Sequence, residues 1–291
     1  MKFSEENVES LRNILNKFID HLDHFGSEKT KESKSLDKAE STVNKLLYRT
    51  RLNVIGIEKL LTSYKKDCAM FHPLSHLLRC MQTDFLTFFY LMTFHIEEKD
   101  LVSLSNELDH LDRDYIKSAI EIFQVEIELP LNNSNFKHQN EDEINEFKKS
   151  LLDTNKHLFK NNDINSRLKR SKELRETSND NLFSSKENRG RPGNGMLSEK
   201  YKYERILKTN YKKYSDAYLL YKYFSQQYHF SNISNRLLEK DGADNNFFYL
   251  IWAISHMFIL TDMQIQFLDG KNSEYLDLIR KQHKELEKAL K

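Results

Sequence analysis

Glycine, proline and cysteine are scarce in this chain of 291 residues, which contains 7 Gly, 3 Pro and 2 Cys. Folds with many tight turns, such as β-sandwiches, barrels and propellers, need more glycine and proline than this. The chain also lacks the glycine-rich phosphate loops of nucleotide-binding α/β folds and the G-x-S-x-G turn of hydrolases. Two cysteines do not make a disulfide framework at this length. We therefore expect an all-α, multi-helix bundle.

The distribution of apolar residues also bears on location. The first residues include Glu5 and Glu6 where a signal peptide needs an apolar stretch. Two uncharged runs, over 85–96 and 245–261, are both shorter than the roughly 20 apolar residues of a membrane-spanning helix. We expect both runs to be buried bundle helices, the protein to be cytoplasmic, and no membrane to be among its partners.

Apolar residues recur at steps of three and four along most of the chain, which is the spacing of one helical face. This spacing predicts helices over 4–25, 35–64, 73–94, 101–128, 141–159, 199–228, 233–238, 245–268 and 273–291. Pro73 fits the first turn of its helix, the fourth helix ends before Pro130, and Gly270 marks a helix stop. The polar residues of 26–35 predict a linker.

The near-neutral total charge of +1 combines two segments of opposite sign. Residues 96–146 hold 14 acidic and 4 basic side chains, whereas residues 160–213 hold 15 basic and 7 acidic ones. Within the basic segment, 161–198 is polar and poor in apolar residues, which predicts a long mobile insertion. The predicted divisions are an N-terminal helix with its linker, the first part of the bundle, the basic insertion and the second part of the bundle: 1–34, 35–160, 161–198 and 199–291.

A series of potential zinc ligands is spaced by four residues: Cys68, His72, His76 and Cys80. On one continuous helix the two cysteines would stand about 18 Å apart, too far to share an ion. Because Pro73 predicts a helix start, we expect His72 to cap that helix and Cys80 to pack inside it. We expect no metal and no cofactor, although metal binding by this series stays an open alternative.

Two charges stand in the apolar helix predicted over 73–94. Unpaired burial of a charge costs several kcal/mol, so Arg79 and Asp84 both need partners. They are five residues apart and do not face each other along one helix. We expect each to pair with another helix. The pairs would form either a structural polar network or a polar functional site inside the bundle.

Another group of polar residues ends the helix predicted over 199–228. His229 follows a basic stretch, and histidine can serve as a general base near neutral pH. RNA cleavage needs such a base near the 2′-hydroxyl and cations at the phosphate. The alternative is a histidine that interacts with the helix dipole and packs on tyrosines. The other residues of this group are Ser225, Tyr228, Lys208, Lys212, Lys213 and Lys222.

A fourth motif lies in the predicted insertion. The sequence from Arg189 to Pro192 reads R-G-R-P and resembles an AT-hook, a short arm that inserts arginines into the minor groove of A·T-rich DNA. No basic cluster flanks it, so the alternative is a solvated turn in a loop.

Two stretches, 77–91 and 221–231, resemble bacterial HEPN proteins. The first has the pattern L-L-R-x(4)-D and the second the pattern Y-K-x-F-S-x-x-Y-H. The resemblance implies an all-α bundle, homodimers, and metal-independent RNA cleavage by an Arg-x(4–6)-His motif across the dimer. The chain departs from that motif, because the three possible arginine positions before His229 hold Phe224, Tyr223 and Lys222.

These patterns lead to two hypotheses of function. In the first, the protein is a HEPN-like phage-defence or toxin component that acts on RNA. His229 would then be the base, Arg79 and Lys222 would hold phosphate, and the lysines at 208, 212 and 213 would bind RNA. Asp84, with Ser225 and Tyr228, would form a structural polar network. In the second, the bundle is a non-catalytic interaction module that binds a partner protein or antitoxin. In either case we expect a homo-oligomer.

Overall fold

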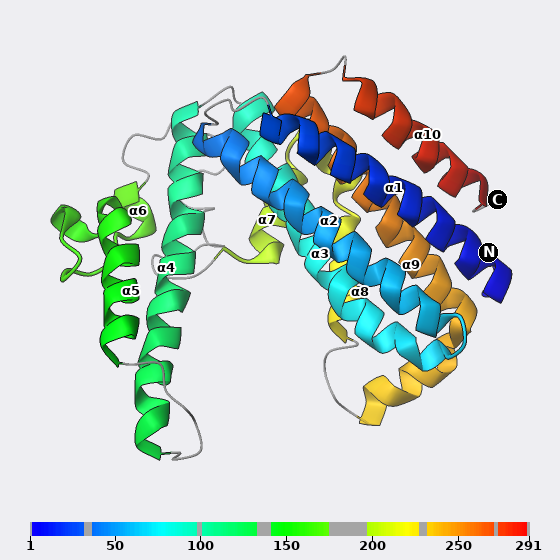
Figure 1. The fold of residues 1–291 in the computed structure, drawn as a ribbon, viewed down its shortest axis with the longest axis horizontal. Coiled ribbons are helices and arrows are strands. Elements are labelled where there is room, and N and C mark those ends of the chain that lie inside the picture. Colours follow the sequence, from blue (N-terminus) through cyan, green and yellow to red (C-terminus); the bar gives the residue numbers. More distant parts are fainter. Residues whose placement is uncertain are drawn as a thin grey trace. The chain divides into compact units, whose positions relative to one another are not determined.

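The computed structural model describes residues 2–31, 37–97, 101–132, 141–174, 197–226, 232–270 and 273–289. Their regular structure is helical, apart from one isolated antiparallel bridge between Phe159 and Leu168, which confirms the all-α prediction (Figure 1). The chain forms two compact units. Unit 1 comprises Met1–Thr93 and Lys202–Lys291, and unit 2 comprises Phe94–Tyr201.

Unit 1 is a bundle of long helices. Figure 1 shows α10, α1, α2 and α3 side by side, and α9 packs against α10, α2 and α3. The short helix α8 packs on α3 and α9. The bounds are α1 Glu5–Lys31, α2 Lys38–Tyr64, α3 Phe71–Met92, α8 Ala217–Gln226, α9 Asn232–Asp269 and α10 Glu274–Ala289. Helix α7 Glu199–Ile206 begins with residues assigned to unit 2 and ends with residues assigned to unit 1.

The helix starts in unit 1 follow from local capping. The Ser4 hydroxyl accepts a hydrogen bond from the Asn7 amide at 3.1 Å, and Asp37 caps α2 in a capping box with Glu40. Pro73 lies in the first turn of α3, as predicted. The predicted linker over 26–35 is wrong for its first part, because α1 continues to Lys31. Phe25 is buried, so its packing holds the last turns of α1 on the core.

A glycine brings α2 and α3 close together. A Cβ atom at Gly56 would stand 2.8 Å from Leu77 Cδ1, which is shorter than a normal contact. Leu77 therefore occupies the space above the Gly56 backbone. The close crossing explains why a residue of low helix propensity stands in the interior of α2.

Helix α9 packs against α2, α3, α8 and α10 and lies in the centre of unit 1. Its side chains at Leu250, Ala253, Ile254 and Leu260 are completely buried. One helix in the described part of the chain, Gly242–Asp269, has the length and composition of a membrane span, but 61% of its apolar window is buried inside the protein. This burial is what a central bundle helix requires. Gly270 ends α9 with a φ of 85°, as the sequence predicts.

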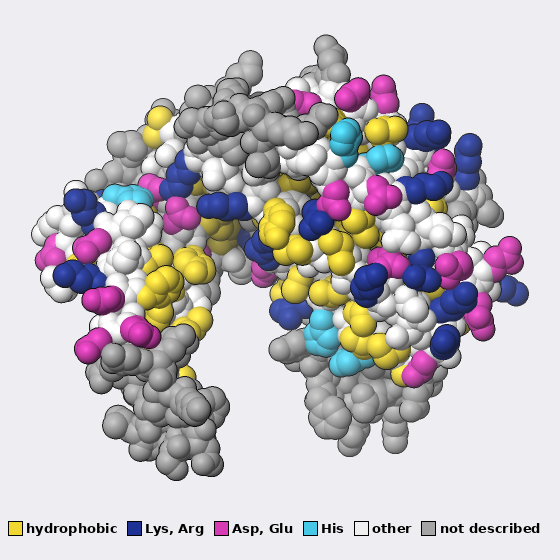
Figure 2. Space-filling model, viewed as in Figure 1, with side chains coloured by type: hydrophobic (Ala, Val, Ile, Leu, Met, Phe, Trp, Pro, Cys, Tyr) yellow, Lys and Arg dark blue, Asp and Glu magenta, His cyan; other side chains and the backbone are white. Residues whose placement is uncertain are grey.

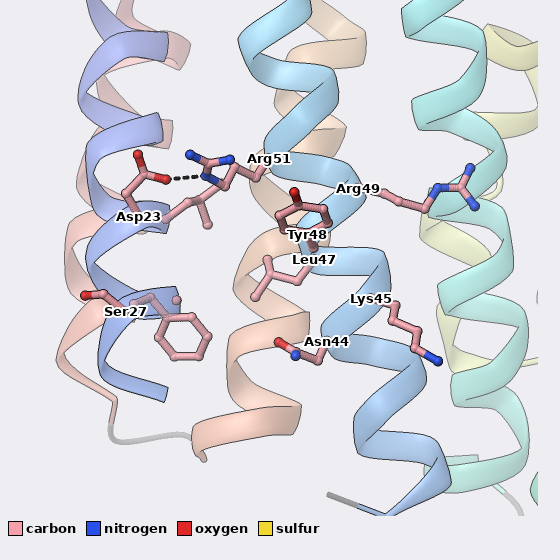
Figure 3. A pocket seen from close by; sticks show the side chains of 11 residues that line it. Asp23, Ser27, Asn44, Lys45, Leu47, Tyr48, Arg49 and Arg51 are labelled. Carbon is pink, nitrogen blue, oxygen red and sulfur yellow. Dashed lines mark hydrogen bonds and ion pairs between the residues drawn. The ribbon is translucent and has the colours of Figure 1, made fainter. Parts of the chain in front are cut away.

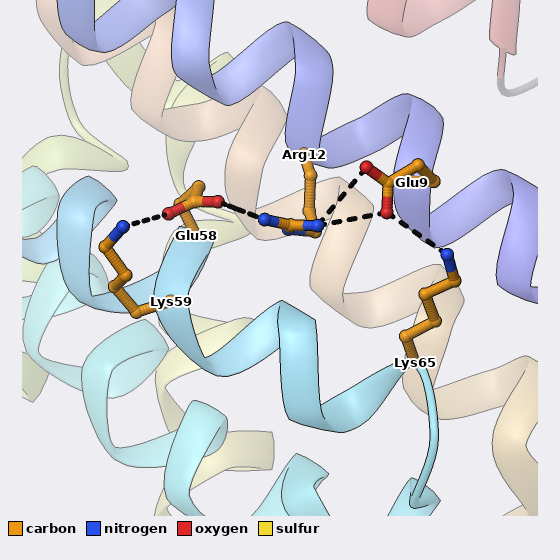
Figure 4. Close-up of polar contacts among 5 residues, drawn as sticks. All are labelled: Glu9, Arg12, Glu58, Lys59 and Lys65. Carbon is orange, nitrogen blue, oxygen red and sulfur yellow. Dashed lines mark hydrogen bonds and ion pairs between the residues drawn. The ribbon is translucent and has the colours of Figure 1, made fainter.

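A network of charges fixes α1 on α2 (Figure 4). The Arg12 guanidinium on α1 lies 2.7 Å from the Glu58 carboxylate, which is buried on α2. Arg12 also contacts Glu9 at 3.0 Å, and Glu9 is 3.3 Å from Lys65 Nζ at the end of α2. A buried carboxylate without a cation is costly, so this network selects one register between the two helices.

Unit 2 is built on α4 Leu101–Asn132 and α5 Glu141–Thr154, with the short helix α6 Ser171–Leu174. Helix α4 continues past Pro130, so the predicted end before that proline is wrong. The predicted insertion over 161–198 is ordered at its start, because Leu174 is buried and Arg167 binds Glu173 through two hydrogen bonds of 2.8 and 2.7 Å. Residues 175–196 lie outside the described residues.

The boundaries of the two units differ from the segment boundaries that we predicted from the sequence. The predicted first bundle part, 35–160, is split after Thr93, and its second half belongs to unit 2. The predicted helix over 199–228 is also divided, into α7, a 3₁₀ turn at Asn210–Tyr214 and α8. Thr209 causes this break, because its hydroxyl oxygen accepts the amide hydrogen of Tyr211 at 3.1 Å and starts the turn.

Candidate nucleic-acid interface

Arg79 projects from α3 to α8. Its guanidinium carbon lies 5.5 Å from the centre of the Tyr221 ring. A guanidinium over an aromatic face makes a favourable cation–π contact. The prediction that Arg79 faces another helix is therefore confirmed, and its neighbour belongs to the second stretch that resembles HEPN proteins.

Tyr221 belongs to a row of stacked tyrosines. Its ring lies 6.0 Å from that of Tyr218 with an interplanar angle of 17°, and the Tyr218 ring lies 4.6 Å from that of Tyr203 on α7 at an angle of 18°. We call Tyr203, Tyr218 and Tyr221 the tyrosine row. Lys222 places its Nζ 5.5 Å from the Tyr218 ring centre. Arg79 and Lys222, predicted from separate motifs, thus contact the same pair of rings.

The sequence of α8 explains why this row reaches the surface. Leu220 and Phe224 are buried and anchor the helix on the core. Positions 218, 221 and 222 share the opposite face, at helical spacings of three and four residues. All three tyrosines of the row are partly exposed, and Lys222 is exposed. The row therefore presents aromatic edges and faces, with cations, to solvent.

The three predicted RNA-binding lysines precede α8 along the chain. Lys208, Lys212 and Lys213 are exposed. They lie in and beside the 3₁₀ turn that divides the predicted helix, and Lys213 Nζ is 4.7 Å from the centre of the Tyr214 ring. The turn thus adds positive charge in the residues that lead into α8.

Asp84 pairs with another helix, as predicted. Its carboxylate is 98% buried, and one oxygen lies 3.0 Å from the Arg49 guanidinium on α2. Burial raises the pKa of Asp84 to about 6, although the charges of Arg49 and Lys202 oppose the shift. The structure does not join Asp84 to Ser225, whose hydroxyl donates to the Tyr221 carbonyl of its own helix. The third predicted member, Tyr228, lies outside the described residues.

A buried polar group on α9 was missed by sequence reasoning. His256 contacts Gln82 Oε1 at 3.0 Å and Asp216 Oδ2 at 3.2 Å through its two ring nitrogens. Trp252 donates to the same Asp216 oxygen at 3.1 Å. Burial raises the pKa of Asp216, but the hydrogen bonds from His256 and Trp252 outweigh it and lower that pKa. The only sequence signal was a histidine inside an apolar run. Because His256 is buried and both nitrogens are engaged, the group is structural.

A serine and a histidine also meet between α9 and α10. Ser255 Oγ lies 2.7 Å from His283 Nε2, and Glu287 Oε1 lies 3.9 Å from the same nitrogen. In a catalytic triad the carboxylate instead binds the other ring nitrogen. Ser255 stands inside α9, where the backbone amides are engaged in the helix and cannot stabilise an oxyanion. Burial lowers the pKa of His283, and the pair serves to join the two helices.

The structure corrects two predictions about the series of possible zinc ligands. Cys68 and Cys80 are both exposed, so the prediction that Cys80 packs inside is wrong. His72 does not cap α3, because Met70 occupies the cap position. The His72 and His76 rings meet edge to face at 5.0 Å. Among the described residues, no group of three or more His, Cys, Asp or Glu side chains lies together as metal ligands would.

A cavity of about 660 Å³ opens between α1 and α2 (Figure 3). Its apolar part comes from Leu22, Phe25 and Leu47. Arg51 forms an ion pair with Asp23, and Arg49 points away from α1 and pairs with Asp84. The lining residues include Asp23, Lys45 and Tyr48 but no histidine or cysteine, and Asp23 is held in the ion pair with Arg51.

His229 lies outside the described residues, as does the Arg189–Pro192 motif. Comparison of the chain with protein-family models, curated proteins and solved structures gives no match. The candidate site consequently consists of the tyrosine row with Arg79 and Lys222.

Proposed function

We propose that the protein binds RNA on the tyrosine row and acts on it as a HEPN-like phage-defence or toxin component. The observation that carries the proposal is the position of Arg79 and Lys222. The first contacts Tyr221 and the second contacts Tyr218, and these two rings stack on each other. Two cations predicted to hold phosphate therefore stand on one aromatic surface.

This combination suits RNA for a physical reason. Proteins that bind single strands combine cations that follow the phosphates with aromatic rings on which bases stack. The exposed Lys208, Lys212 and Lys213 add attraction for a polyanion.

Binding is tested by the fluorescence anisotropy of a labelled RNA. Arg79→Ala and Lys222→Ala each remove one cation, so we expect each to weaken binding by roughly 5- to 10-fold. Each should also reduce the slope of log affinity against log salt concentration by about one. Lys17→Ala is the matched control, because Lys17 is exposed on α1, which packs on α2 and α10. Equal affinity of all four proteins would contradict the proposal.

Cleavage is a separate part of the proposal and rests on His229. The resemblance implies a base at this position, and a base is needed to remove the 2′-hydroxyl proton. Expression of wild type should arrest growth and deplete RNA, whereas His229→Ala should do neither. If the variant is as toxic as wild type, with equal RNA loss, His229 is not the base, and RNA binding stands on its own evidence.

The second candidate function, a helical interaction module, is favoured by a different observation. Unit 2 exposes large apolar side chains at Tyr115, Ile122 and Val125 on α4 and at Phe147 on α5. Figure 2 shows hydrophobic side chains gathered at the surface over these helices. Exposed apolar patches mark interaction sites. We assign this surface to a second copy of the chain, and its test is the oligomeric state.

A further inference from the structure

A second group of aromatic rings flanks α8. Tyr223 at the end of α8 stacks on Tyr249 of α9, with ring centres 3.9 Å apart and an interplanar angle of 28°. The Tyr249 ring lies 6.3 Å from Trp252 at an angle of 14°. We call Tyr223, Tyr249 and Trp252 the α9 aromatic row. All three rings pack against the core on one side and are partly exposed.

The two rows occupy neighbouring faces of one helix. At about 100° per residue, Tyr218 and Tyr223 are separated by about 140° around α8. The sector between them holds Leu219 and Lys222, and Leu219 is 55% exposed. No buried side chain of α8 stands in that sector, so a flexible ligand can pass from one row to the other across Lys222.

Hydrogen bonds hold the rings of the α9 aromatic row in place. The Tyr223 hydroxyl donates to Asn246 Oδ1 at 2.7 Å, and Trp252 Nε1 donates to Asp216 Oδ2 at 3.1 Å. Rings that are already oriented lose little conformational entropy when a ligand stacks on them. Phe248 extends the aromatic surface, with its ring 5.9 Å from Trp252 and 45% of its surface exposed.

The charges beside the two rows determine where the bases and where the phosphates of a nucleic acid can bind. Asp216 lies beside Trp252, is partly exposed, and has a lowered pKa that keeps it ionised at neutral pH. An ionised carboxylate repels phosphate, so the α9 aromatic row favours bases. Lys222 between the rows supplies the cation for the phosphate backbone.

From this arrangement we infer that the ligand is single-stranded RNA, which crosses α8 from the tyrosine row to the α9 aromatic row. A duplex hides the base faces that the rings need, whereas a single strand offers them. The inference rests on the proposed function, because it extends the same RNA-binding site.

Trp252 is the only tryptophan of the chain and reports on the second row directly. The probe is a labelled 2′-O-methyl oligouridine of about 12 nucleotides, which cannot be cleaved through its 2′-hydroxyl groups. Titration should quench Trp252 emission with the same midpoint as the rise in RNA anisotropy. Base stacking in this row predicts that Tyr249→Ala weakens binding by roughly 5- to 100-fold, and that Tyr249→Phe binds as wild type does.

Two further variants distinguish a loss of RNA binding from a loss of folding. Leu219→Glu places a negative charge on an exposed position between the rows and should also weaken binding. Tyr48→Ala removes a tyrosine that is 59% exposed on α2 and should have no effect. Far-UV circular dichroism verifies that each variant is folded.

The outcomes separate this inference from the proposed function. RNA binding without Trp252 quenching, and without an effect of Tyr249→Ala and Leu219→Glu, overturns the second row and leaves the proposed function intact. Absence of binding in both signals overturns both. If the oligouridine probe binds equally well after it is annealed to oligoadenosine, the ligand is not specifically single-stranded. If oligothymidine binds more tightly than the oligouridine probe, the ligand is single-stranded DNA and not RNA.

Discussion

In the described residues, the main cluster of buried side chains in unit 1 draws on α1, α2, α3, α8, α9 and α10, although others such as Phe85 and Phe89 lie outside it. The clusters described for unit 2 contain three to five buried side chains each. One of these clusters centres on Ile116 and Phe159, and another on Ala119 and Phe123. A larger contiguous core contributes more free energy of folding, because apolar burial scales with area. We expect unit 1 to be stable by itself and unit 2 to be the weaker unit.

The surfaces of the two units differ in one respect. Both units expose large apolar side chains, among them Leu219 in unit 1 and Ile122 in unit 2, but the described stacked tyrosines with Lys222 beside them belong to unit 1. Stacked rings beside a cation suit a polyanion with flat bases, and exposed apolar side chains suit a protein. We therefore propose RNA binding for unit 1 and self-association for unit 2.

The largest expected effect comes from truncating one buried phenylalanine in each unit. Phe258 is 1% exposed in unit 1 and Phe159 is 2% exposed in unit 2. Each Phe→Ala change should cost about 3–5 kcal/mol through lost burial and a residual cavity. Phe159→Ala should unfold unit 2 first and leave unit 1 folded, whereas Phe258→Ala should destabilise unit 1.

Chemical denaturation followed by two signals separates these events. Trp252 emission reports unit 1 alone, while far-UV circular dichroism reports the helices of both units. Phe147→Ala and Phe248→Ala are the controls, since these rings are 63% and 45% exposed. A single transition that both core variants shift equally would show that the units do not unfold separately.

Periodicity alone gives the helical class and most long helices of unit 1. The spacing of apolar residues finds α2, α3 and α10 to within a few residues, because each buries one continuous stripe. It misses the break before α8, because that break depends on one side chain: the Thr209 hydroxyl accepts the Tyr211 amide hydrogen and starts a 3₁₀ turn. It also misses the continuation of α1, which depends on the packing of Phe25 in the folded bundle.

The candidate site was predictable in its residues and not in its arrangement. Arg79 and Lys222 could be selected because a charge in an apolar helix and a basic stretch are visible in the sequence. Their meeting on stacked tyrosines depends on how α3 packs against α8, which no local pattern encodes. The α9 aromatic row was missed for the same reason, since Tyr223 and Trp252 come from different helices.

The next effect concerns the pH dependence of unit 1. Burial raises the pKa of Asp84 from 3.8 to about 6 in the folded protein. The folded state then binds more protons than the unfolded state between these values, so its stability falls as pH rises through them, by about 3 kcal/mol. Asp84→Asn removes this group, and its unfolding free energy should exceed that of wild type above about pH 6.

Urea denaturation of both proteins between about pH 4 and pH 8, followed by Trp252 emission, measures this difference. Subtracting the two profiles removes the contributions of other titrating groups. If the pairing of Asp84 with Arg49 outweighs burial, the difference has the opposite sign and Asp84→Asn is the less stable protein at neutral pH.

A smaller effect is expected at the close crossing of α2 and α3. Gly56→Val brings its side chain against Leu77 and should cost about 1–3 kcal/mol. Gly26→Ala is the comparison in α1, where an added Cβ meets nothing within 4 Å. It should stabilise unit 1 by about 1 kcal/mol through higher helix propensity. Thermal denaturation of the two variants should therefore shift in opposite directions, and shifts of equal sign would contradict the crossing geometry.

The smallest effect on stability is expected at the apolar surface of unit 2. Ile122 is 54% exposed, so Ile122→Lys should change the unfolding free energy by less than about 0.5 kcal/mol. A charge there should nevertheless separate two copies of the chain, because it adds the cost of desolvating a lysine to the interface. Light scattering should give a dimer for wild type and a monomer for the variant. Gln124→Lys, on the other side of α4, should stay a dimer. A monomeric wild type, or equal loss of the dimer in both variants, would contradict self-association through this surface of unit 2.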